Sequence, residues 1–538
     1  MQSTMQEAPL GIARLLRHVA AVTGGTPLVA ARPDGGRWRG RLGDLALRAG
    51  RLADALSRRG IATGDVVCSF AAASPEHLEA YLAVPAMGAV LHTLNIRLHD
   101  DQLAAMVAES GAGVILVDGA LAARFAELAP GLARGAVRLV IVTGQDAPVS
   151  FAGLPVETIG YEALLVEGLP RSDWPDPDEN AAAILCYTGG TTGQPKGIAY
   201  SHRSLWLQAI SLCTANSLGI GEATVILPAV PFYHVNGWGL PYAAMMAGAK
   251  LVLPGTRFQP AVLNPLLDEE GVTLAAGVPT IWSDMLAARK AAGLPAPPQL
   301  RRIVTGGAPV PDTLVAAWGA LGVETQTAWG MTETSSMSAI GAPSGQVAAA
   351  GRVVCGLEMR TATLEGVPLP ADGRTPGELQ IRGPWVTARY FRRAAEDGFQ
   401  DGWLRTGDIG TLDAEGRVRL TDRVKDAIKS GGEWIPSLPL EEAIRSHPSV
   451  LDVAVIAMPD PRWQERPLAL VVAGPGFSPD LMPAHLSARV AKWWVPAHWA
   501  RLDSLPRTTV GKADKVAMRR MLANGDLQIE QIGAATPA

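Results

Sequence analysis

The sequence has few cysteines, little net charge and no long apolar run. Its cysteines, Cys68, Cys186, Cys213 and Cys355, are far apart and show no CxxC spacing, so no disulfide framework is indicated. This pattern is typical of buried, reduced thiols in a cytosolic protein. The net charge of −4 comes without a long run of Lys or Arg, so the charge pattern gives no sign of a nucleic-acid partner. We expect the partner to be a small molecule or another protein.

Signals for export and membrane insertion are also missing. Residues 1 to 16 carry Glu7 and Arg14 and lack both a continuous apolar core and a small-residue cleavage site, which argues against a secretory signal. No segment approaches the roughly 18 consecutive apolar residues that span a bilayer. We therefore expect a soluble, cytoplasmic protein, and the sequence leaves open whether it forms a homodimer.

The apolar residues that are present indicate several domains. With 538 residues, 48% of them hydrophobic, the chain exceeds what one core usually organises. Short apolar runs at 66–70, 114–117 and 139–142 alternate with helical patterns, and the alternation returns between 225 and 321, which predicts an α/β fold with doubly wound sheets. Residues 359–385 predict a small antiparallel β-subdomain, and the residues beyond 425 predict a compact α+β domain with a helix over 481–494.

Glycine, threonine and lysine are concentrated between Tyr187 and Gly197, directly after an apolar segment short enough to be a buried strand. Unobstructed backbone N–H groups, hydroxyls and an ammonium group suit a polyphosphate. A glycine-rich surface turn is the alternative. Lys196 follows Pro195 and precedes Gly197, so the Gly-Lys-Ser/Thr ending of a Walker loop is absent.

The run Tyr-Thr-Gly-Gly-Thr-Thr-Gly-Gln-Pro-Lys-Gly closely resembles the signature loop of the adenylate-forming superfamily, which contains acyl-CoA synthetases, luciferases and nonribosomal-peptide adenylation domains. Gly189 departs from the Ser or Thr usual at its position, which removes one hydroxyl but leaves the cradle. The resemblance implies that this loop holds the β- and γ-phosphates of ATP. The residues to which it assigns ATP are Thr188, Gly190, Thr191, Thr192, Gly193 and Lys196.

Three later segments follow predicted strands, where ligands gather in doubly wound sheets. Taken alone, a His and a Trp at a strand end favour core packing, and glycines there favour a tight turn as much as a close approach to a ligand. The resemblance implies an acyl pocket at the first segment, with Trp238 gating it, and an adenine and acyl lining at the others. The acyl-pocket residues are His234, Val235, Asn236, Trp238, Gly277, Val278 and Gly306, and the nucleotide lining includes Gly307, Ala308 and Pro309.

A carboxylate stands between two threonines at Thr332-Glu333-Thr334. Helix capping explains it as well as a ligand role does. Beside a triphosphate loop, however, Glu333 is a suitable Mg²⁺ ligand, because a hard cation that bridges phosphates prefers carboxylate oxygen. The resemblance assigns Glu333 to Mg²⁺ and assigns AMP to the preceding residues, Ala328, Trp329, Gly330, Met331 and Thr332.

The remaining motifs lie near the end of the chain. The resemblance places Asp408 and Arg423 at the ribose and Lys425 at an interdomain hinge, which divides the chain into an adenylate-forming domain, 1–424, and a mobile domain, 425–538. In the pattern Pro-x-Thr-x-x-Gly-Lys it assigns Lys512 to adenylation, together with Lys196, Thr188 and Glu333. The residues expected beside coenzyme A are Lys429, Gly431, Gly432, Glu433 and Trp434.

Together the motifs predict ATP-dependent activation of a carboxylic acid to acyl-AMP, followed by transfer to coenzyme A, in fatty-acid metabolism. The resemblance is nearest to medium- and long-chain fatty-acid-CoA ligases. An Asp would anchor an amino acid where His234 stands, and Gly237 suggests room for a bulky acid. Pro436 and Pro439 raise an alternative in which thiolation is weak or performed by a partner. A kinase, a luciferase-like oxidase and a non-catalytic nucleotide-binding protein are the rival classes.

Overall fold

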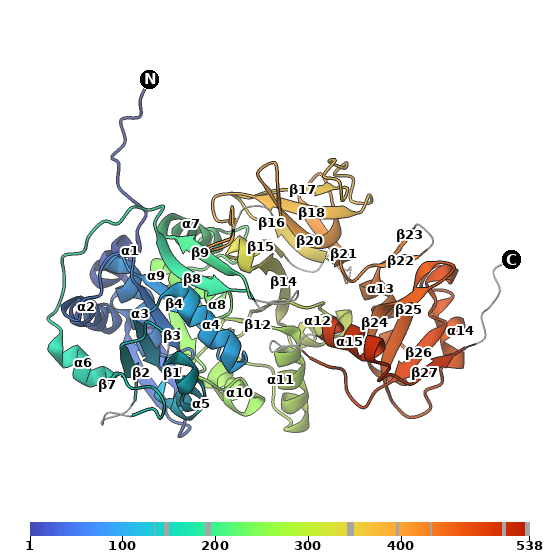
Figure 1. Cartoon of the computed structure of the whole chain (residues 1–538), viewed down its shortest axis with the longest axis horizontal. Helices are drawn as coiled ribbons and strands as arrows, with labels where there is room; N and C mark the ends of the chain where they lie inside the picture. The colour runs from blue at the N-terminus through green and yellow to red at the C-terminus, as the bar shows by residue number, and fades with distance from the viewer. Residues whose placement is uncertain are drawn as a thin grey trace. The chain divides into compact units, whose positions relative to one another are not determined.

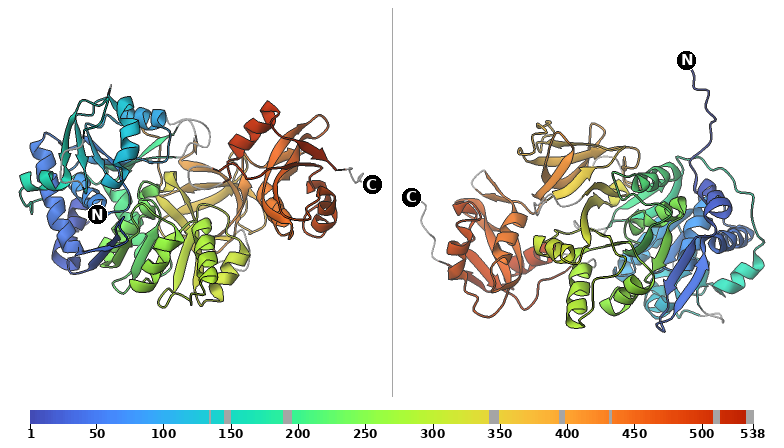
Figure 2. Two further views of the ribbon diagram at one scale, coloured as in Figure 1. Left: turned by 90° about the horizontal axis from the view of Figure 1, so that it is seen from below. Right: turned by 180° about the vertical axis from the view of Figure 1, so that it is seen from behind.

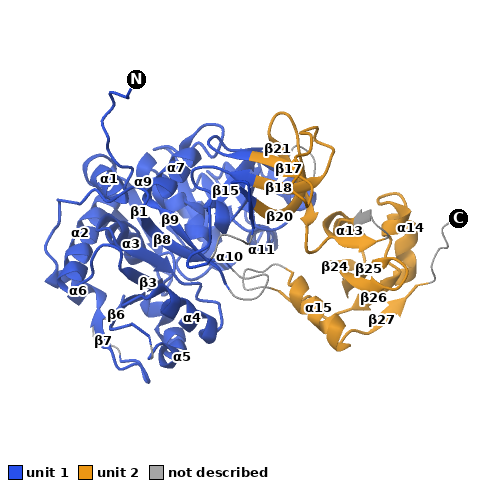
Figure 3. Ribbon diagram, turned by 45° about the horizontal axis from the view of Figure 1, so that its top comes forward, with its two compact units in different colours: residues 1–358, 381–404 blue, residues 359–380, 405–538 orange. Residues whose placement is uncertain are grey.

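The structure is a computed structural model that describes residues 1–133, 135–144, 150–188, 195–341, 349–393, 398–430, 433–507 and 513–532. Figure 1 labels the helices and strands of the chain, which divides into two compact units (Figure 3). Unit 1 comprises residues 1–358 and 381–404, and unit 2 comprises residues 359–380 and 405–538. In the part of the chain that the structure describes, no helix is both long and apolar enough to cross a membrane.

The first sheet of unit 1 has seven strands in the order β7-β6-β5-β3-β4-β8-β9. All neighbours are parallel except β8 and β9, which form an antiparallel pair. The predicted strands at 66–70, 114–117 and 139–142 are confirmed as β3, β5 and β6, buried apolar runs as expected for a sheet covered on both faces. The strands are β3 (Val66–Phe70), β4 (Val90–Thr93), β5 (Val114–Val117), β6 (Leu139–Val142), β7 (Glu157–Gly160), β8 (Ala182–Tyr187) and β9 (Gly197–Ser201).

The second sheet of unit 1 runs in the order β16-β15-β14-β13-β12-β10-β11-β1-β2. Its middle strands are parallel, and β15, β16 and β2 pair antiparallel with their neighbours. The strands are β1 (Pro27–Ala31), β2 (Arg37–Arg41), β10 (Val225–Ala229), β11 (Lys250–Leu253), β12 (Leu274–Gly277), β13 (Arg302–Gly306), β14 (Glu324–Met331), β15 (Ser336–Gly341) and β16 (Ala349–Val353), and the two-residue β19 (Phe399–Gln400) pairs with β20.

Helices lie beside both sheets of unit 1 (Figure 2), and α3 is buried along its whole length. One core lies between α10, α11, α12 and the second sheet, where the rings of Trp282 and Trp318 meet edge to face at 6.2 Å. The helices are α1 (Ile12–His18), α2 (Leu42–Arg58), α3 (Pro75–Ala86), α4 (Asp100–Ser110), α5 (Ala122–Leu132), α6 (Tyr161–Glu167), α7 (His202–Cys213), α8 (Val235–Trp238), α9 (Leu240–Ala247), α10 (Pro260–Glu269), α11 (Pro279–Ala291) and α12 (Asp312–Gly319).

Unit 2 contains most of a strand series β17-β18-β20-β21 and a separate sheet β23-β22-β25-β26-β27, with β24 beside β25. The helix expected over 481–494 is wrong. The only α-helix there is α14, which lies between short 3-10 turns. Val490, Val495 and Trp494, the last in the second 3-10 turn, pack against the core without continuing the helix. The elements are β17 (Glu358–Ala362), β18 (Gly377–Arg382), β20 (Trp403–Leu412), β21 (Arg417–Arg423), β22 (Ile428–Ser430), β23 (Glu433–Ile435), α13 (Ser437–Arg445), β24 (Val450–Asp460), β25 (Gln464–Ala473), α14 (Met482–Leu486), β26 (His498–Arg501), α15 (Lys515–Asn524) and β27 (Ile529–Gln531).

Candidate active site

Four parallel strands of unit 1 bring predicted site residues to one sheet edge. Strands β10, β12, β13 and β14 are neighbours, and their register pairs Ala229 with Gly277, Gly277 with Thr305, and Gly306 with Ala328. The segments that follow β10, β12 and β13, together with the end of β14, therefore meet along this edge, where ligands of such sheets bind. The acyl and nucleotide residues predicted on these segments are brought together as expected.

The glycines at this edge are required by crowding between strands. A Cβ on Gly306 would lie 2.1 Å from the Ala328 carbonyl oxygen, and one on Gly330 would lie 1.5 Å from the Ser336 carbonyl oxygen. Gly277 is packed against the Trp282 ring, which would be 3.1 Å from an added Cβ. The sequence suggested that these glycines allow a tight turn or the close approach of a ligand. The contacts with the neighbouring backbone and with the Trp282 ring explain them more directly.

Thr188 and Lys196 close the neck of the predicted phosphate loop. The Thr188 N–H donates to the Lys196 carbonyl oxygen at 2.9 Å, and the Lys196 N–H donates to the Thr188 hydroxyl oxygen at 3.2 Å. The loop thus connects two antiparallel strands, β8 and β9, and its two ends are fixed side by side. The assignments to Gly190, Thr191, Thr192 and Gly193 fall outside the described residues and stay predictions.

One tyrosine lies between two of the predicted catalytic residues. The Lys196 ammonium is 4.5 Å from the centre of the Tyr390 ring, and the Tyr390 hydroxyl donates to Glu333 Oε1 at 3.0 Å. Tyr390 and Glu333 are both buried. The structure therefore brings Lys196 and Glu333 to opposite parts of one aromatic side chain. The sequence reasoning missed Tyr390, which is far from both in the chain and lies in a segment that carries no recognised motif.

Glu333 lies in the 3-10 turn Thr332–Thr334 that follows β14. Thr334 performs the capping proposed for this stretch, because its hydroxyl accepts a hydrogen bond from the Met331 N–H at 3.1 Å. The Glu333 carboxylate is not used for this cap. The turn is fixed further because the Thr387 N–H donates to the Glu333 carbonyl oxygen at 2.8 Å and the Tyr200 hydroxyl donates to the Thr332 carbonyl oxygen at 2.6 Å. The carboxylate is thus held on a rigid turn.

These residues fit a magnesium ion that arrives with a nucleotide. No group of three His, Cys, Asp or Glu side chains suited to a metal occurs among the described residues. A cation that arrives at Glu333 with ATP would share phosphate oxygens, which is the usual coordination of Mg²⁺ bound with ATP. The buried Glu333 carboxylate, which contacts Tyr390 as Lys196 does, fits such a site.

The predicted acyl segment has an unusual backbone. Val235, Asn236, Gly237 and Trp238 have φ values of 33°, 43°, 63° and 60°. Asn236 is buried, and its side-chain amide donates to the Thr93 hydroxyl at 3.2 Å, which joins the segment to the end of β4. Such left-handed conformations in non-glycine residues are costly and persist where the surroundings impose them.

The space beside Gly237 does not support the expectation of room for a bulky acid. A Cβ at this position would meet Cδ1 of Phe232 at 2.8 Å. Phe232, which is fully buried, occupies that side of the glycine. Gly237 is explained by its left-handed φ and by this ring contact, so it gives no information on substrate bulk.

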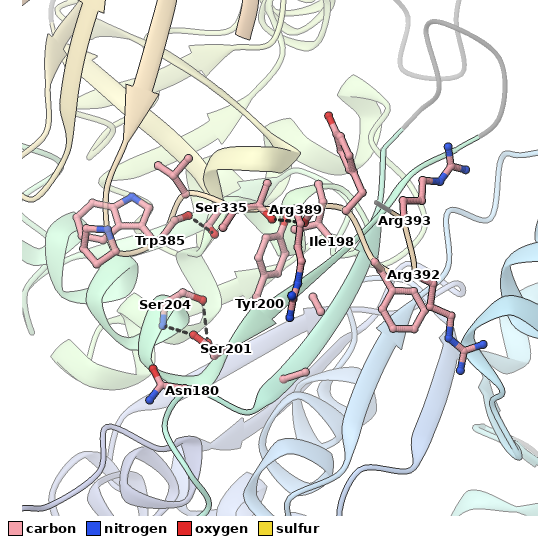
Figure 4. Close-up of a pocket in the computed structure, with 18 residues that line it drawn as sticks. Asn180, Ile198, Tyr200, Ser201, Ser204, Ser335, Trp385, Arg389, Arg392 and Arg393 are labelled. Carbon is pink, nitrogen blue, oxygen red and sulfur yellow. Dashed lines mark hydrogen bonds between the residues drawn. The ribbon is translucent and has the colours of Figure 1, made fainter. Parts of the chain in front are cut away.

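A cavity of about 630 Å³ lies beside β9 and is bordered by the segment 384–393 (Figure 4). It extends along β9 from Ile198, next to the neck of the predicted phosphate loop, to Ser201 at the end of the strand. It shares Tyr390 and Ser335 with the surroundings of Glu333. The cavity therefore adjoins the buried surroundings of Glu333.

The predicted ribose residues pair with each other in unit 2. Asp408 on β20 and Arg423 on β21 are register partners, and Nε of Arg423 lies 3.1 Å from Oδ1 of Asp408. Asp408 is buried, and Lys425 is exposed two residues after β21. Lys429 is exposed on β22, while Gly431, Gly432 and Lys512 lie outside the described residues, as do the side chains of Glu433 and Trp434.

Pro436 and Pro439 do not interrupt a strand, so the sequence argument for impaired thiolation loses its basis. Strand β23 ends at Ile435, Pro436 is the N-cap of α13, and Pro439 is in the first turn of that helix. Backbone N–H groups in the first turn have no partner within the helix, and proline is tolerated there.

Comparison with known proteins agrees with this layout. The family model described as AMP-binding enzyme matches residues 18–391, and the AMP-binding enzyme C-terminal domain matches residues 439–512. A long-chain-fatty-acid–CoA ligase of Thermus thermophilus is 39% identical, covering 97% of each chain, and a medium-chain-fatty-acid–CoA ligase of Ectopseudomonas oleovorans is 37% identical, covering 96% of this chain and 97% of the relative.

A solved structure of o-succinylbenzoate CoA synthetase from Bacillus subtilis, in complex with its acyl-adenylate intermediate, is 26% identical with a TM-score of 0.79, covering 96% of this chain and 99% of that one. The anthranilate CoA ligase AuaEII, 22% identical with a TM-score of 0.85, covers 98% of this chain and 100% of its own and shares the fold. The chain belongs to the AMP-binding enzyme family.

Proposed function

We propose that the protein is an AMP-forming acid–thiol ligase. It converts a carboxylic acid and ATP to acyl-AMP and pyrophosphate, and then transfers the acyl group to coenzyme A with release of AMP. The observation that carries the proposal is the arrangement of Lys196, Tyr390 and Glu333 beside the neck of the loop, within a chain that matches the family along most of its length.

In the first half-reaction, a carboxylate oxygen attacks the α-phosphorus of ATP, and the bond from that phosphorus to the pyrophosphate oxygen breaks. Positioning and neutralisation of phosphate charge provide most of the catalysis of such a step. Lys196 at the loop neck and Lys512 supply positive charge, and Glu333 would hold Mg²⁺, which neutralises phosphate oxygens when bound. Thr188 and the loop residues that follow it contact the phosphates.

The nucleotide and the second half-reaction use the remaining motifs. The proposed AMP contacts are the end of β14, Gly307 to Pro309, and Asp408 with Arg423 at the ribose. In the second step, the coenzyme A sulfur attacks the acyl carbonyl carbon after loss of its proton, and the carbonyl carbon–oxygen bond to AMP breaks. We place coenzyme A beside residues 429–434, with a mobile domain at 425–538 that turns at Lys425.

The substrate we propose is a hydrophobic medium- or long-chain carboxylic acid. His234 stands where an amino-acid-activating relative would carry an Asp, and the relatives named above act on medium- and long-chain fatty acids. Each methylene removed from water contributes about 0.8 kcal/mol, so chain-length preference follows the depth of the pocket formed by residues 234–238 and the ends of β12 and β13.

The experiment is a pyrophosphate-release screen over a panel of carboxylic acids, with and without coenzyme A. We expect acid-dependent pyrophosphate, AMP rather than ADP, and acyl-CoA when coenzyme A is present. Release of ADP, or pyrophosphate formation that needs no acid, would contradict the proposal. Acyl-AMP that accumulates despite coenzyme A would instead favour transfer by a partner. A cytoplasmic location and a homodimer are tested by cell fractionation and by sedimentation.

A further inference from the structure

Two basic residues on one face of α15 contact the segment around the proposed hinge. Lys515 is the first residue of α15 and Arg519 is one turn further, so both side chains lie on the same side of the helix. Lys515 is also three residues after Lys512. Helix α15 therefore begins just after the proposed catalytic lysine.

Lys515 is the centre of a buried polar network. Its ammonium donates to the Ser437 hydroxyl oxygen at 2.6 Å and pairs with Oε1 of Glu441 at 2.6 Å. The Ser437 hydroxyl in turn donates to Oδ1 of Asp422 at 3.0 Å, and the Ser437 N–H donates to Oδ2 of the same carboxylate. All four side chains are at most 9% exposed. This network joins the start of α15 to β21, three residues before Lys425.

The side chain of Asp422 caps the N-terminus of α13. The N-cap position of α13 is Pro436, which makes no side-chain hydrogen bond to the helix. The Asp422 carboxylate accepts from the first N–H of α13 in its place, and an anion at a helix N-terminus is also stabilised by the helix dipole. A residue of β21 thus caps a helix that lies beyond the hinge.

Arg519 binds the other side of the hinge. Its guanidinium donates to the Lys425 carbonyl oxygen at 2.9 Å and forms an ion pair with Asp426. Helix α15 therefore contacts the chain on both sides of Lys425. Before Lys425, the contact runs from Lys515 through Ser437 to Asp422. After Lys425, Arg519 contacts Asp426.

We propose that Lys515 and Arg519 are positioning residues: they fix the start of α15, which lies three residues after Lys512 in the sequence, relative to the hinge at Lys425. The inference rests on the proposed function, because it assumes that Lys512 acts in adenylation. Rotation at Lys425 would separate Asp422, which stays on β21, from Ser437 and Lys515, while Arg519 stays with Asp426. The α15 contacts would thus carry the start of α15 with the chain beyond Lys425, and Asp422 would hold one orientation of that part of the chain.

The test measures the two half-reactions separately on the same preparations. Acid-dependent ATP–pyrophosphate exchange reports adenylation, and acyl-CoA formation from supplied acyl-AMP reports thioester formation. We expect Lys515→Met and Arg519→Gln each to lower exchange at least tenfold while thioester formation changes less than threefold. Arg520→Gln is the matched control, since Arg520 is exposed on the same helix, and it should change neither rate.

Ser437→Ala provides a milder variant if Lys515→Met fails to fold, because it removes the hydroxyl between Asp422 and Lys515 and keeps the backbone cap. We expect about a fivefold loss of exchange, restored at least halfway by Ser437→Thr. Trypsin cleavage after Arg423 or Lys425 should also become several-fold faster in these variants than in Arg520→Gln. Equal losses in both half-reactions, or unchanged exchange and cleavage, would overturn the inference. A wild type without exchange on any acid would instead remove the proposed function itself.

Discussion

Tyr390 is the residue whose substitution tests the site most directly, because it makes two separable contacts. Tyr390→Phe keeps the ring under Lys196 and removes the hydroxyl that donates to Glu333, whereas Tyr390→Leu removes both. A hydrogen bond to a charged group contributes about 1.5–3 kcal/mol, and a partly exposed cation–π contact contributes about 0.5–1 kcal/mol. Tyr390→Phe therefore removes only the contact with Glu333, whereas Tyr390→Leu removes the contacts with both Glu333 and Lys196.

We expect Tyr390→Phe to lower kcat/KM for adenylation by roughly tenfold, because about 1.4 kcal/mol of transition-state stabilisation corresponds to a factor of ten. Most of this loss should appear in the Mg²⁺ dependence, since a carboxylate without its hydroxyl donor is less well oriented for the cation. Tyr390→Leu should lose a further twofold to fivefold, and it should also weaken binding of ATP measured without Mg²⁺, because Lys196 is then free to move toward Glu333.

The assays are initial-rate pyrophosphate exchange at varied Mg²⁺ and calorimetric titration with ATP in chelator. Tyr161→Phe is the matched control, because the Tyr161 hydroxyl donates to Glu79 at 2.6 Å in the buried scaffold, far in sequence from the site motifs. It should lower stability without changing the Mg²⁺ dependence. If Tyr390→Phe showed the same Mg²⁺ dependence and exchange rate as Tyr161→Phe, the positioning of Glu333 by Tyr390 would be refuted.

Four further outcomes are expected. Lys512→Ala should fold normally and lose about a hundredfold in exchange, and normal exchange would contradict its assignment. Gly330→Ala should fail to fold or lower the melting temperature sharply, because its Cβ meets backbone, whereas Gly319→Ala has open space around it and should have little effect; calorimetry compares them. Pro436→Ala and Pro439→Ala should leave acyl-CoA formation within twofold of wild type, and a large gain would revive the view that these prolines impair it. Burial raises the pKa of Asp422 to about 6, so the folded protein binds this proton more tightly than the unfolded chain does. The free energy of unfolding should therefore fall by up to about 3 kcal/mol as the pH rises from about 4 to 6. Urea titrations over this pH range should show a smaller fall for Asp422→Asn, and an unchanged fall would exclude Asp422 as its source.

Much of the fold follows from local sequence, because parallel strands buried on both faces appear as continuous apolar runs. The strands at 66–70, 114–117 and 139–142 were predictable for that reason. The early end of α14 was not predictable, since residues such as Val490 and Trp494 fit an α-helical pattern but cover the core of unit 2 without continuing the helix. Tertiary packing decided that segment, and the pattern alone could not.

The site was predictable as a set of motifs but not as a set of contacts. Lys196 and Glu333 were assigned to the candidate site from their neighbours in sequence. Tyr390 contacts both because the segment after β18 lies against the start of β9, where the Phe391 N–H donates to the Gly197 carbonyl oxygen at 2.7 Å. The sequence signal available was an aromatic side chain between arginines, which is also common on ordinary surfaces. Contacts between distant segments leave no local periodicity.

Three glycines also show what sequence motifs cannot predict, because their motifs suggested ligand contacts and the structure shows packing contacts. Gly306, Gly330 and Gly237 lie in or beside motifs associated with nucleotide and acyl binding, so close approach of a ligand was a reasonable expectation. Their immediate neighbours are instead a carbonyl oxygen of an adjacent strand in two cases and the Phe232 ring in the third. A glycine in a binding motif can therefore be retained for the packing that builds the site. Substituting such a glycine tests the scaffold, whereas substituting Lys196, Glu333 or Tyr390 tests the proposed chemistry.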